Sequence, residues 1–116
     1  MIKIYIASRY SIGNKEENVK YAMSASNELI KLGFAPFSPL LSHYQDIYFP
    51  QPYKKWLELD LEWLHQCDCL FRLPGESAGA DLEEEEALLY GIPVFKNIEF
   101  FKEWSAKCNG VPEVKK

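Results

Sequence analysis

Apolar and polar positions divide the chain into short strand-like runs and longer segments with helical spacing. The short runs are rich in β-branched and aromatic residues, and glycine, proline or small polar residues bound most of them. The predicted strands occupy residues 2–7, 34–39, 68–73 and 91–95. The predicted helices occupy residues 14–32, 52–66, 80–90 and 98–108. Strand and helix therefore alternate along the chain.

The first predicted helix has recognisable ends. Asn14 is a favourable N-cap residue, and Gly33 is the residue type that most often follows a helix C-terminus. Apolar residues at helical spacing form the face predicted to be buried: Val19, Ala22, Leu29 and Ile30. The pattern therefore predicts an amphipathic helix.

Residues 40–51 show neither the helical period nor the strand period, and they are rich in aromatic side chains. Two interpretations remain open for them: a packed surface loop, or a lid over a ligand. After the last helix, residues 109–116 are expected to form a loose tail. The chain shows no repeat, linker or low-complexity segment, so a single domain is predicted over residues 1–116.

Alternating strands and helices favour parallel pairing with right-handed crossover connections. The predicted fold is a small three-layer α/β domain of the flavodoxin or Rossmann type, with a parallel sheet of at least four strands. Ligands of such sheets bind beyond the carboxyl ends of the strands. The loops at residues 7–14, 39–51 and 73–80 are expected to converge there.

One carboxylate lies on the apolar side of a predicted helix. With about 100° of rotation per residue, Asp60 falls near the middle of an arc of large apolar residues. That arc contains Trp56, Leu57, Leu59, Leu61, Trp63 and Leu64. A carboxylate among core residues is unfavourable unless it is paired, hydrogen-bonded or protonated. Asp60 is therefore either a structural residue bound to a backbone N–H group or a functional carboxyl group.

A second candidate carboxylate lies in the acidic run at residues 83–86, after a glycine-containing loop. Most acidic runs are solvated, and Asp81 with Glu84 fits a capping pattern at the helix start. Glu83 is expected in the first helical turn, where the helix dipole favours a carboxylate. The capping pattern accounts for Asp81 and Glu84 but gives no reason for a glutamate at position 83.

The same helix start offers a candidate anion site. Ser77, Gly79 and the free N–H groups of the preceding turn can hold an anion such as phosphate. If Asp60 and Glu83 meet at one cleft, one carboxyl group can act as nucleophile and the other as acid or base. This is the pairing used in glycosidic bond cleavage.

Composition and charge limit the classes of partner. The chain has 116 residues, 47% of them apolar, and a formal net charge of −4. The negative charge argues against binding to a nucleic acid polymer, and no apolar run is long enough to cross a membrane. Met1 leads directly into a predicted strand rather than into a targeting peptide, and the odd number of cysteines suggests a reducing compartment. A cytoplasmic protein is expected.

Cysteine and histidine, which often bind metals, show no convincing ligand pattern. Cys67 and Cys69 flank a predicted strand and His65 lies close to them, but no fourth ligand follows at zinc-site spacing. His43 has no ligand-like spacing to His65. We therefore expect thiols at the cysteines, Cys108 included, and no metal site.

Three sequence stretches together resemble the nucleoside 2-deoxyribosyltransferase superfamily, which includes the deoxynucleoside 5′-monophosphate N-glycosidases. The stretches are IYIASRYS at the first strand, DLEWLHQCD in the helix with Asp60, and SAGADLE followed by ALLYGIPV. The resemblance covers roughly residues 2–96 and looks closest to small members of the group. It implies a nucleoside deoxyribosyltransferase-like fold and an enzyme that acts on N-glycosidic bonds.

The resemblance also implies roles for individual residues. Glu83 ends an S/D-x-G-x-x-x-E pattern and corresponds to the family's nucleophile. Asp60 corresponds to the residue that assists the leaving base, and Tyr5 to a tyrosine that contacts the nucleophile. Glu84 and Glu85 are then expected to be solvated.

Further residues are expected to bind substrate. Monophosphate N-glycosidases of the superfamily carry serine six residues before the nucleophile, where nucleoside transferases carry aspartate, and this chain has Ser77. A hydroxyl can donate to a phosphate that a carboxylate would repel. Ser8 and Arg9 are expected to add donors, although many relatives have proline or a small residue in place of Arg9. Tyr10 is expected either to stack on the base or to serve only in packing.

The leading hypothesis is an N-glycosidase or 2-deoxyribosyltransferase acting on a (deoxy)nucleoside 5′-monophosphate or nucleoside through a glycosyl-enzyme on Glu83. It requires no metal or organic cofactor. The resemblance also implies a homodimer or larger homo-oligomer. Two other hypotheses remain open: a non-catalytic nucleotide-binding or sensor module on the same fold, and an interaction protein whose segment 40–53 binds another chain.

Overall fold

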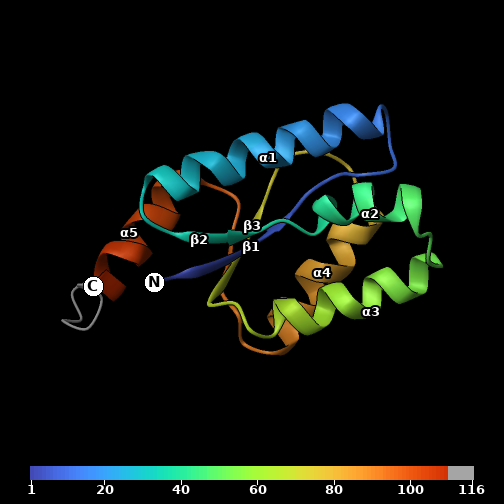
Figure 1. Ribbon diagram of the computed structural model, residues 1–116. Coiled ribbons are helices and arrows are strands. Elements are labelled where there is room, and N and C mark those ends of the chain that lie inside the picture. The colour runs from blue at the N-terminus through green and yellow to red at the C-terminus, as the bar shows by residue number, and fades with distance from the viewer. Residues whose placement is uncertain (110–116) are drawn as a thin grey trace.

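The protein folds around one parallel sheet, and the computed structural model describes residues 1–109. The strands are β1 (Lys3–Ala7), β2 (Ala35–Phe37), β3 (Cys69–Arg72) and β4 (Val94–Phe95). The helices are α1 (Lys15–Lys31), the 3-10 turn η1 (Pro39–Leu41), α2 (Ser42–Tyr48), α3 (Tyr53–Leu64), α4 (Ala78–Leu89) and α5 (Ile98–Asn109). The strand order is β2-β1-β3-β4, and all three pairings are parallel (Figure 1). The α/β fold predicted from the sequence is confirmed.

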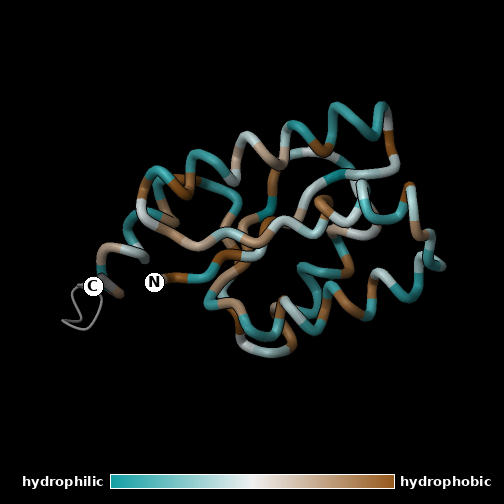
Figure 2. The backbone as a smooth tube through the Cα atoms, in the orientation of Figure 1, coloured by the Kyte–Doolittle hydropathy of each residue, from teal (hydrophilic) through white to brown (hydrophobic). Residues whose placement is uncertain are grey.

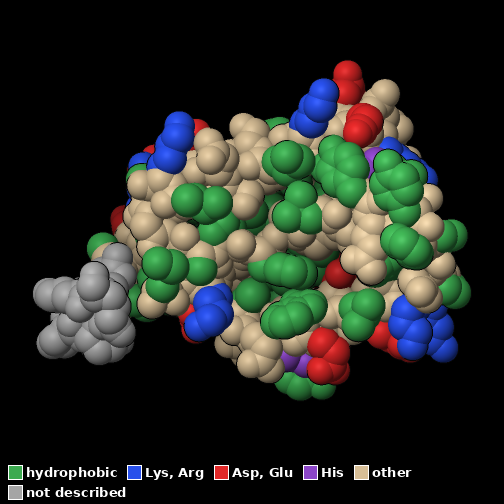
Figure 3. All heavy atoms as spheres, viewed as in Figure 1, with side chains coloured by type: hydrophobic (Ala, Val, Ile, Leu, Met, Phe, Trp, Pro, Cys, Tyr) green, Lys and Arg blue, Asp and Glu red, His purple; other side chains and the backbone are tan. Residues whose placement is uncertain are grey.

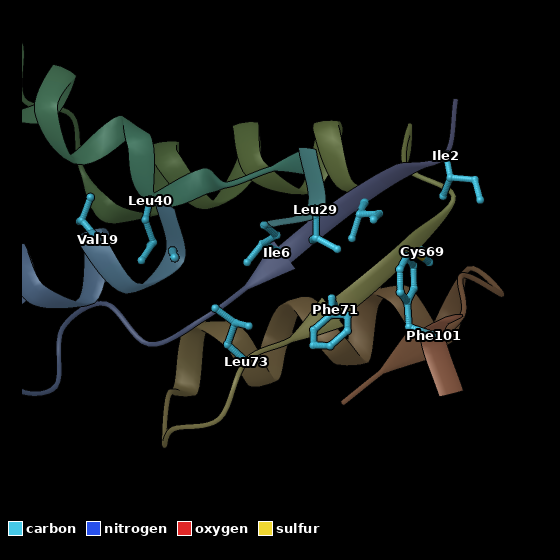
Figure 4. Packing of buried hydrophobic residues seen from close by; sticks show 11 residues of the cluster. Ile2, Ile6, Val19, Leu29, Leu40, Cys69, Phe71, Leu73 and Phe101 are labelled. Atoms are coloured by element: carbon cyan, nitrogen blue, oxygen red, sulfur yellow. The ribbon is translucent and has the colours of Figure 1, made fainter. Parts of the chain in front are cut away.

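The first of two cores joins the sheet to α1 and α5. Val19 and Leu29 of α1 pack with Ile6 of β1 and Phe71 of β3, and Phe101 of α5 completes the cluster (Figure 4). Apolar residues of α1 belong to this cluster, whereas much of the rest of the helix is hydrophilic (Figure 2). Burial of this face stabilises α1 against the sheet.

The second core lies on the opposite face, under α3 and α4. Successive side chains of a strand point to opposite faces, so β1 supplies both cores. Ile4 and Ile6 belong to the first core, whereas Tyr5 and Ala7 pack with α3 and α4. All four residues are fully buried. The alternation therefore places the Tyr5 side chain inside the molecule, beneath α4.

The chain reverses its winding direction at β1. The connection through α1 leads to β2 on one side of β1, and the connection through α3 leads to β3 on the other. At the carboxyl end of this pair, Ala7 lies opposite Arg72. The crevice beside such a reversal is the usual ligand site of doubly wound sheets.

The ends of α1 agree with the sequence, but its predicted buried face is partly wrong. Asn14 Oδ1 accepts a hydrogen bond of 3.0 Å from Glu17 N, and Gly33 has a φ of 94°. Three of the predicted face residues are buried: Val19, Ala22 and Leu29. Ile30 is 58% exposed, because it lies about 100° further round the helix than Leu29 and turns away from the sheet.

Residues 40–51, predicted as a loop or lid, are mostly helical. They contain most of η1 and all of α2, which has only seven residues. A helix of two turns is too short to show a reliable hydrophobic period. No helix within residues 1–109 is long and apolar enough to span a bilayer. The predicted tail lies outside the described residues, except for Asn109 at the end of α5.

Candidate active site

A cavity of about 470 Å³ lies at the carboxyl ends of the strands. Four segments contribute to its wall: residues 8–12 after β1, 39–46 in η1 and α2, 53–60 in α3, and 77–83 in α4. The three loops expected to converge at this edge all contribute. An acidic side chain is recessed among hydrophobic side chains between α2 and α3 (Figure 3).

Glu83 is held on the cavity wall by a tyrosine of the central strand. Glu83 is only 7% exposed, and Tyr5 is fully buried. The Tyr5 hydroxyl donates a hydrogen bond of 2.5 Å to Glu83 Oε2. One carboxyl oxygen of Glu83 is therefore fixed by Tyr5, and Oε1 takes no part in this bond.

Burial governs the ionisation of this pair. It raises the pKa of Glu83 to about 8, against the opposing effect of the Tyr5 hydrogen bond. Asp60 raises that pKa further, and Arg72 lowers it. Burial also raises the pKa of Tyr5 well above its usual range, as does the charge of Glu83. Tyr5 therefore remains a neutral hydrogen-bond donor over the physiological pH range.

Asp60 lines the same cavity from α3. It is half-buried, and burial raises its pKa to about 7. The apolar arc predicted around it is too wide: Leu64 is buried, but Leu59 and Trp63 are 43% and 56% exposed. Only one side of α3 packs on the sheet and α4, so the rest of the arc faces solvent. The structure nevertheless brings Asp60 and Glu83 to one cavity.

α4 begins earlier than predicted, and Ser77 is its N-cap. Ser77 Oγ accepts a hydrogen bond of 3.1 Å from Ala80 N. The first two helical residues, Ala78 and Gly79, give no periodic signal in the sequence. The prediction that Glu83 lies in the first turn is therefore wrong, since the early start places it in the second turn.

Three predicted binding residues share the cavity wall near this helix start: Ser8, Ser77 and Gly79. Ser8 is 6% exposed, and its hydroxyl has no hydrogen-bond partner among the residues the structure describes. A buried hydroxyl without a partner is unfavourable, so a ligand group that pairs with it gains stability. A Cβ at Gly79 would lie 3.3 Å from the Tyr53 hydroxyl, so glycine allows this close approach.

Arg9 does not line the cavity with the other predicted binding residues. Its Nε donates a hydrogen bond of 3.3 Å to the carbonyl of Glu76, and its side chain lies against Gly75. The direction of a loop side chain depends on tertiary contacts that no local pattern encodes. The structure therefore separates Arg9 from Ser8 and Ser77.

Tyr10 lines the cavity beside a histidine that the sequence analysis did not select. The Tyr10 hydroxyl lies 2.7 Å from Nδ1 of His43, and the Lys15 ammonium lies 5.3 Å from the centre of the Tyr10 ring. The sequence does not mark His43 as a site residue, because it has no ligand-like spacing to His65. The aromatic content of residues 40–51 was the only signal that this segment lines a ligand site.

Asp46 and Trp56 are two further cavity residues that the sequence analysis did not select. Asp46 Oδ1 accepts hydrogen bonds of 2.9 Å from Gln51 N and 2.6 Å from Trp56 Nε1. These bonds lower the pKa of the Asp46 carboxyl group. They also tie α2 to α3, so the two helices form one continuous wall.

Other acids of α4 form ion pairs rather than a solvated run. Arg72 Nη1 lies 2.7 Å from Asp81 Oδ1 and 3.2 Å from Glu84 Oε1, and Lys96 Nζ lies 3.2 Å from Glu84 Oε2. The predicted capping role of Asp81 and the predicted solvation of Glu84 are therefore wrong. Glu85 is exposed, as predicted.

The cysteines are reduced in the structure. Cys69 is buried, and Cys67 and Cys108 are half-buried. Burial raises the pKa of the Cys67 thiol to about 11 and that of Cys69 to about 12. Within residues 1–109, no three His, Cys, Asp or Glu side chains form a group that could hold a metal ion.

Residues 2–97 match the profile of a family described as "Domain of unknown function (DUF7768)". The chain belongs to this family. Among solved structures, the DUF7768 domain is similar to a 2-deoxyribosyltransferase from the psychrotolerant bacterium Bacillus psychrosaccharolyticus, with a TM-score of 0.58 and 26% sequence identity. The match covers 79% of this chain and 69% of that chain. The comparison with curated proteins gives no match.

The structural similarity supports the α/β fold and the resemblance to the superfamily. The transferase is described as a biocatalyst for the synthesis of antiviral and antitumoral nucleosides.

Proposed function

We propose that this DUF7768 domain is an enzyme that cleaves or transfers the N-glycosidic bond of a (deoxy)nucleoside or its 5′-monophosphate. The observation that carries the proposal is the buried Glu83, which accepts a hydrogen bond from Tyr5 and shares its cavity with Asp60. Two carboxyl groups at one cavity can supply a nucleophile and an acid. The similarity to a 2-deoxyribosyltransferase supports the same chemistry.

In the proposed first step, ionised Glu83 attacks C1′ of the sugar through a carboxylate oxygen. The C1′–N bond breaks, and its electron pair leaves with the base. Asp60 gives its proton to the departing nitrogen and becomes a carboxylate. The product is a glycosyl ester on Glu83, held while the base leaves.

In the second step, water or the nitrogen of another base attacks C1′. Asp60, now a carboxylate, accepts the proton that this nucleophile loses, and the C1′–O bond to Glu83 breaks. Water gives hydrolysis, and a second base gives transfer. Both routes return Asp60 to its acid form and Glu83 to its ionised form.

The raised pKa values bear on the proton that Asp60 must hold in the first step. Burial raises the pKa of Asp60 to about 7 and that of Glu83 to about 8, so the pair holds protons near neutral pH. When the pair holds one proton, attack on C1′ requires that this proton is on Asp60 and that Glu83 is ionised. The pKa of Glu83 already includes the lowering effect of the Tyr5 hydrogen bond. A base nitrogen that accepts a hydrogen bond from protonated Asp60 is therefore the contact that favours the proton on Asp60.

The 5′ end of the substrate is proposed to lie at the start of α4. Ser77, the unpartnered hydroxyl of Ser8 and the N–H groups near Gly79 offer donors there. Within residues 1–109, no lysine or arginine lines the cavity. A 5′-phosphate would therefore depend on hydroxyl and N–H donors and on the helix dipole.

Base release tests the proposal. The protein is incubated with matched nucleosides and 5′-monophosphates, with and without a second base, and free and exchanged bases are separated by chromatography. Glu83→Gln is expected to lower release by at least about a thousandfold, because the nucleophile is lost. Glu85→Gln, on the same helix but exposed, is the matched control and should retain wild-type activity.

A binding experiment separates the enzyme from the alternative of a non-catalytic module. Glu83→Gln should bind substrates by calorimetry with an affinity near that of the wild type. Wild-type protein that binds nucleotides but releases no base from any of them would show a sensor or binding module instead. Equal base release from wild type and Glu83→Gln would show that another residue is the nucleophile.

Asp60→Asn tests the acid. The variant should slow release most for bases that leave poorly without protonation and least for bases that leave readily as anions. Folded content is checked by thermal melting, because an amide avoids the burial of charge and should not weaken the fold. Equal losses for good and poor leaving groups would contradict proton donation by Asp60.

A further inference from the structure

The loop that leads from β3 to α4 is held by two guanidinium groups. Arg72 Nη2 donates a hydrogen bond of 2.9 Å to the carbonyl of Gly75, and Arg9 Nε donates one of 3.3 Å to the carbonyl of Glu76. Gly75 has a φ of 129°, and a Cβ there would lie 3.2 Å from Arg9 Nε. The loop is therefore packed closely between these arginines and leads directly into the N-cap of α4.

Arg72 also binds α4 directly. Its side chain is 11% exposed, and its Nη1 donates hydrogen bonds of 2.7 Å to Asp81 Oδ1 and 3.2 Å to Glu84 Oε1. Charge-assisted bonds in a fixed fork geometry restrict orientation as well as distance. One side chain at the end of β3 thus contacts the loop that follows and the first two turns of α4.

Glu83 immediately precedes one of these contacts in the helix. A helix moves largely as a rigid body, so a shift of α4 along or about its axis displaces the Glu83 carboxyl from the Tyr5 hydroxyl and from Asp60. Tyr5 is anchored in β1, and Asp60 in α3. The geometry between these groups therefore depends on what fixes α4 to the sheet. Arg72 is the charged group that spans this junction.

We propose that Arg72 is a positioning residue for the Glu83 carboxyl group, acting by tying the end of β3 and the following loop to the first two turns of α4. The proposal rests on the proposed function of Glu83 as nucleophile. Arg72 does not line the cavity, so it acts through Glu83 and not on the substrate.

The positive charge of Arg72 has a second effect, which acts on the ionisation of Glu83. The charged and titratable groups that face Glu83 are Tyr5 from β1, Asp60 from α3 and Arg72 from β3. Among them, only Arg72 is a cation, and it lowers the pKa of Glu83 against the effect of burial. Loss of the cation should therefore move the ionisation of Glu83 to higher pH.

Two substitutions separate geometry from charge. Arg72→Lys keeps the cation but loses the fork that reaches Gly75, Asp81 and Glu84 together. It should lower kcat by about tenfold, because small displacements of reacting groups have large effects, and leave the acid limb of the pH profile in place. Arg72→Gln should lower kcat further and move the acid limb to higher pH.

Matched controls keep the comparison clear. Lys96→Gln removes the exposed cation that also contacts Glu84, and it should keep kcat within about twofold of wild type. Arg72→Gln leaves Asp81 without its cation and Glu84 with Lys96 alone. The fold is therefore checked in the variant Arg72→Gln/Asp81→Asn, which removes one charge of each sign. That variant should fold and remain slow.

A second readout does not depend on turnover. The carboxyl carbon of Glu83 is titrated by ¹³C NMR, with Glu83→Gln used to assign the signal. A higher midpoint of the Glu83 titration in Arg72→Gln supports the proposal for Arg72, even if the wild-type protein releases no base. The absence of base release would count only against the proposed glycosidase activity. Wild-type kcat per folded molecule together with an unmoved Glu83 titration in Arg72→Gln would overturn it.

Discussion

At the scale of residues, the protonation of Glu83 is coupled to folding. Its pKa in the folded chain is raised from 4.5 to about 8, mainly by burial. A group of this kind contributes stability that is fully present below the unfolded-state pKa and is lost as the pH rises through the folded-state pKa. For Glu83 the loss falls between about pH 4.5 and pH 8. Asp60 adds a loss that ends near pH 7.

Glu83→Gln should therefore stabilise the fold at high pH only. At about pH 4 the carboxyl group is largely protonated in both states, so wild type and variant should unfold at similar urea concentrations. At about pH 9 the variant should be more stable by about 2–4 kcal/mol, because each pKa unit corresponds to about 1.4 kcal/mol and local relaxation offsets part of the cost. Urea unfolding at the two pH values measures the difference.

The exposed Glu85 supplies the control for this stability prediction. Glu85→Gln should show the same change of stability between the two pH values as wild type, because its carboxyl group stays in solvent. A gain of equal size at low and high pH in Glu83→Gln would point to packing rather than to the burial of charge, since packing does not depend on pH.

The sequence located the site residues in helices better than those in loops. Helical rotation alone placed Asp60 on an apolar face, and it lines the cavity. Glu83 needed the motif resemblance, because nothing in a run of four glutamates separates one from the others. Arg9 and His43 lie outside long periodic elements, so their directions depend on contacts far along the chain.

At the scale of elements, α4 combines three features of the proposed site. Ser77 caps it, its first residues Ala78 and Gly79 line the cavity, and Glu83 follows in the second turn. Six residues of helix correspond to about 9 Å along the axis. A pentose with a 5′ substituent can extend along this distance, with its 5′ end at the cap and C1′ toward Glu83.

Ser77→Asp should change the choice between a nucleoside and its 5′-monophosphate. Aspartate caps a helix about as well as serine, so stability should hold. Its charge repels phosphate and replaces a donor, so kcat/KM for the monophosphate should fall by about ten- to a hundredfold. The kcat/KM for the nucleoside should stay the same or rise, because a carboxylate can accept a hydrogen bond from a 5′-hydroxyl. The ratio of the two kcat/KM values is the measurement.

Ser77→Ala is the control for this substitution. It removes the cap and one donor without adding charge, and it should lower stability by about 1 kcal/mol. If Ser77→Asp left the substrate ratio unchanged, Ser77 would be a cap only, and the 5′ end of the substrate would lie elsewhere.

The long helices were predictable, whereas the short helix α2 and the start of α4 were not. α1, α3 and α5 lie within a few residues of their predicted bounds. The start of α4 was missed because Ala78 and Gly79 carry no pattern. β4 lies within the strand predicted at residues 91–95 but is only two residues long. α2 was missed because two turns give too few positions to show a period, although its contacts with α3 build one wall of the cavity.

At the scale of the molecule, alternation of strand and helix was enough to predict a parallel sheet covered on both faces. Alternation could not predict the shape of the cavity, because its wall comes from four separate segments spread over residues 8–83. The strand order β2-β1-β3-β4 brings them together at the reversal of winding. The cavity is therefore a property of the whole topology and not of any one motif.

This arrangement predicts where a bound ligand protects the backbone. A nucleoside or monophosphate bound to Glu83→Gln, which holds it without turnover, should slow amide exchange in residues 39–46 and 77–83. α5 packs against the opposite face of the sheet, so residues 98–109 should exchange at the unliganded rate. Hydrogen exchange followed by mass spectrometry measures both regions in one experiment. Protection confined to α1 and α5 would place the ligand on the other face, and the proposed site would then be wrong.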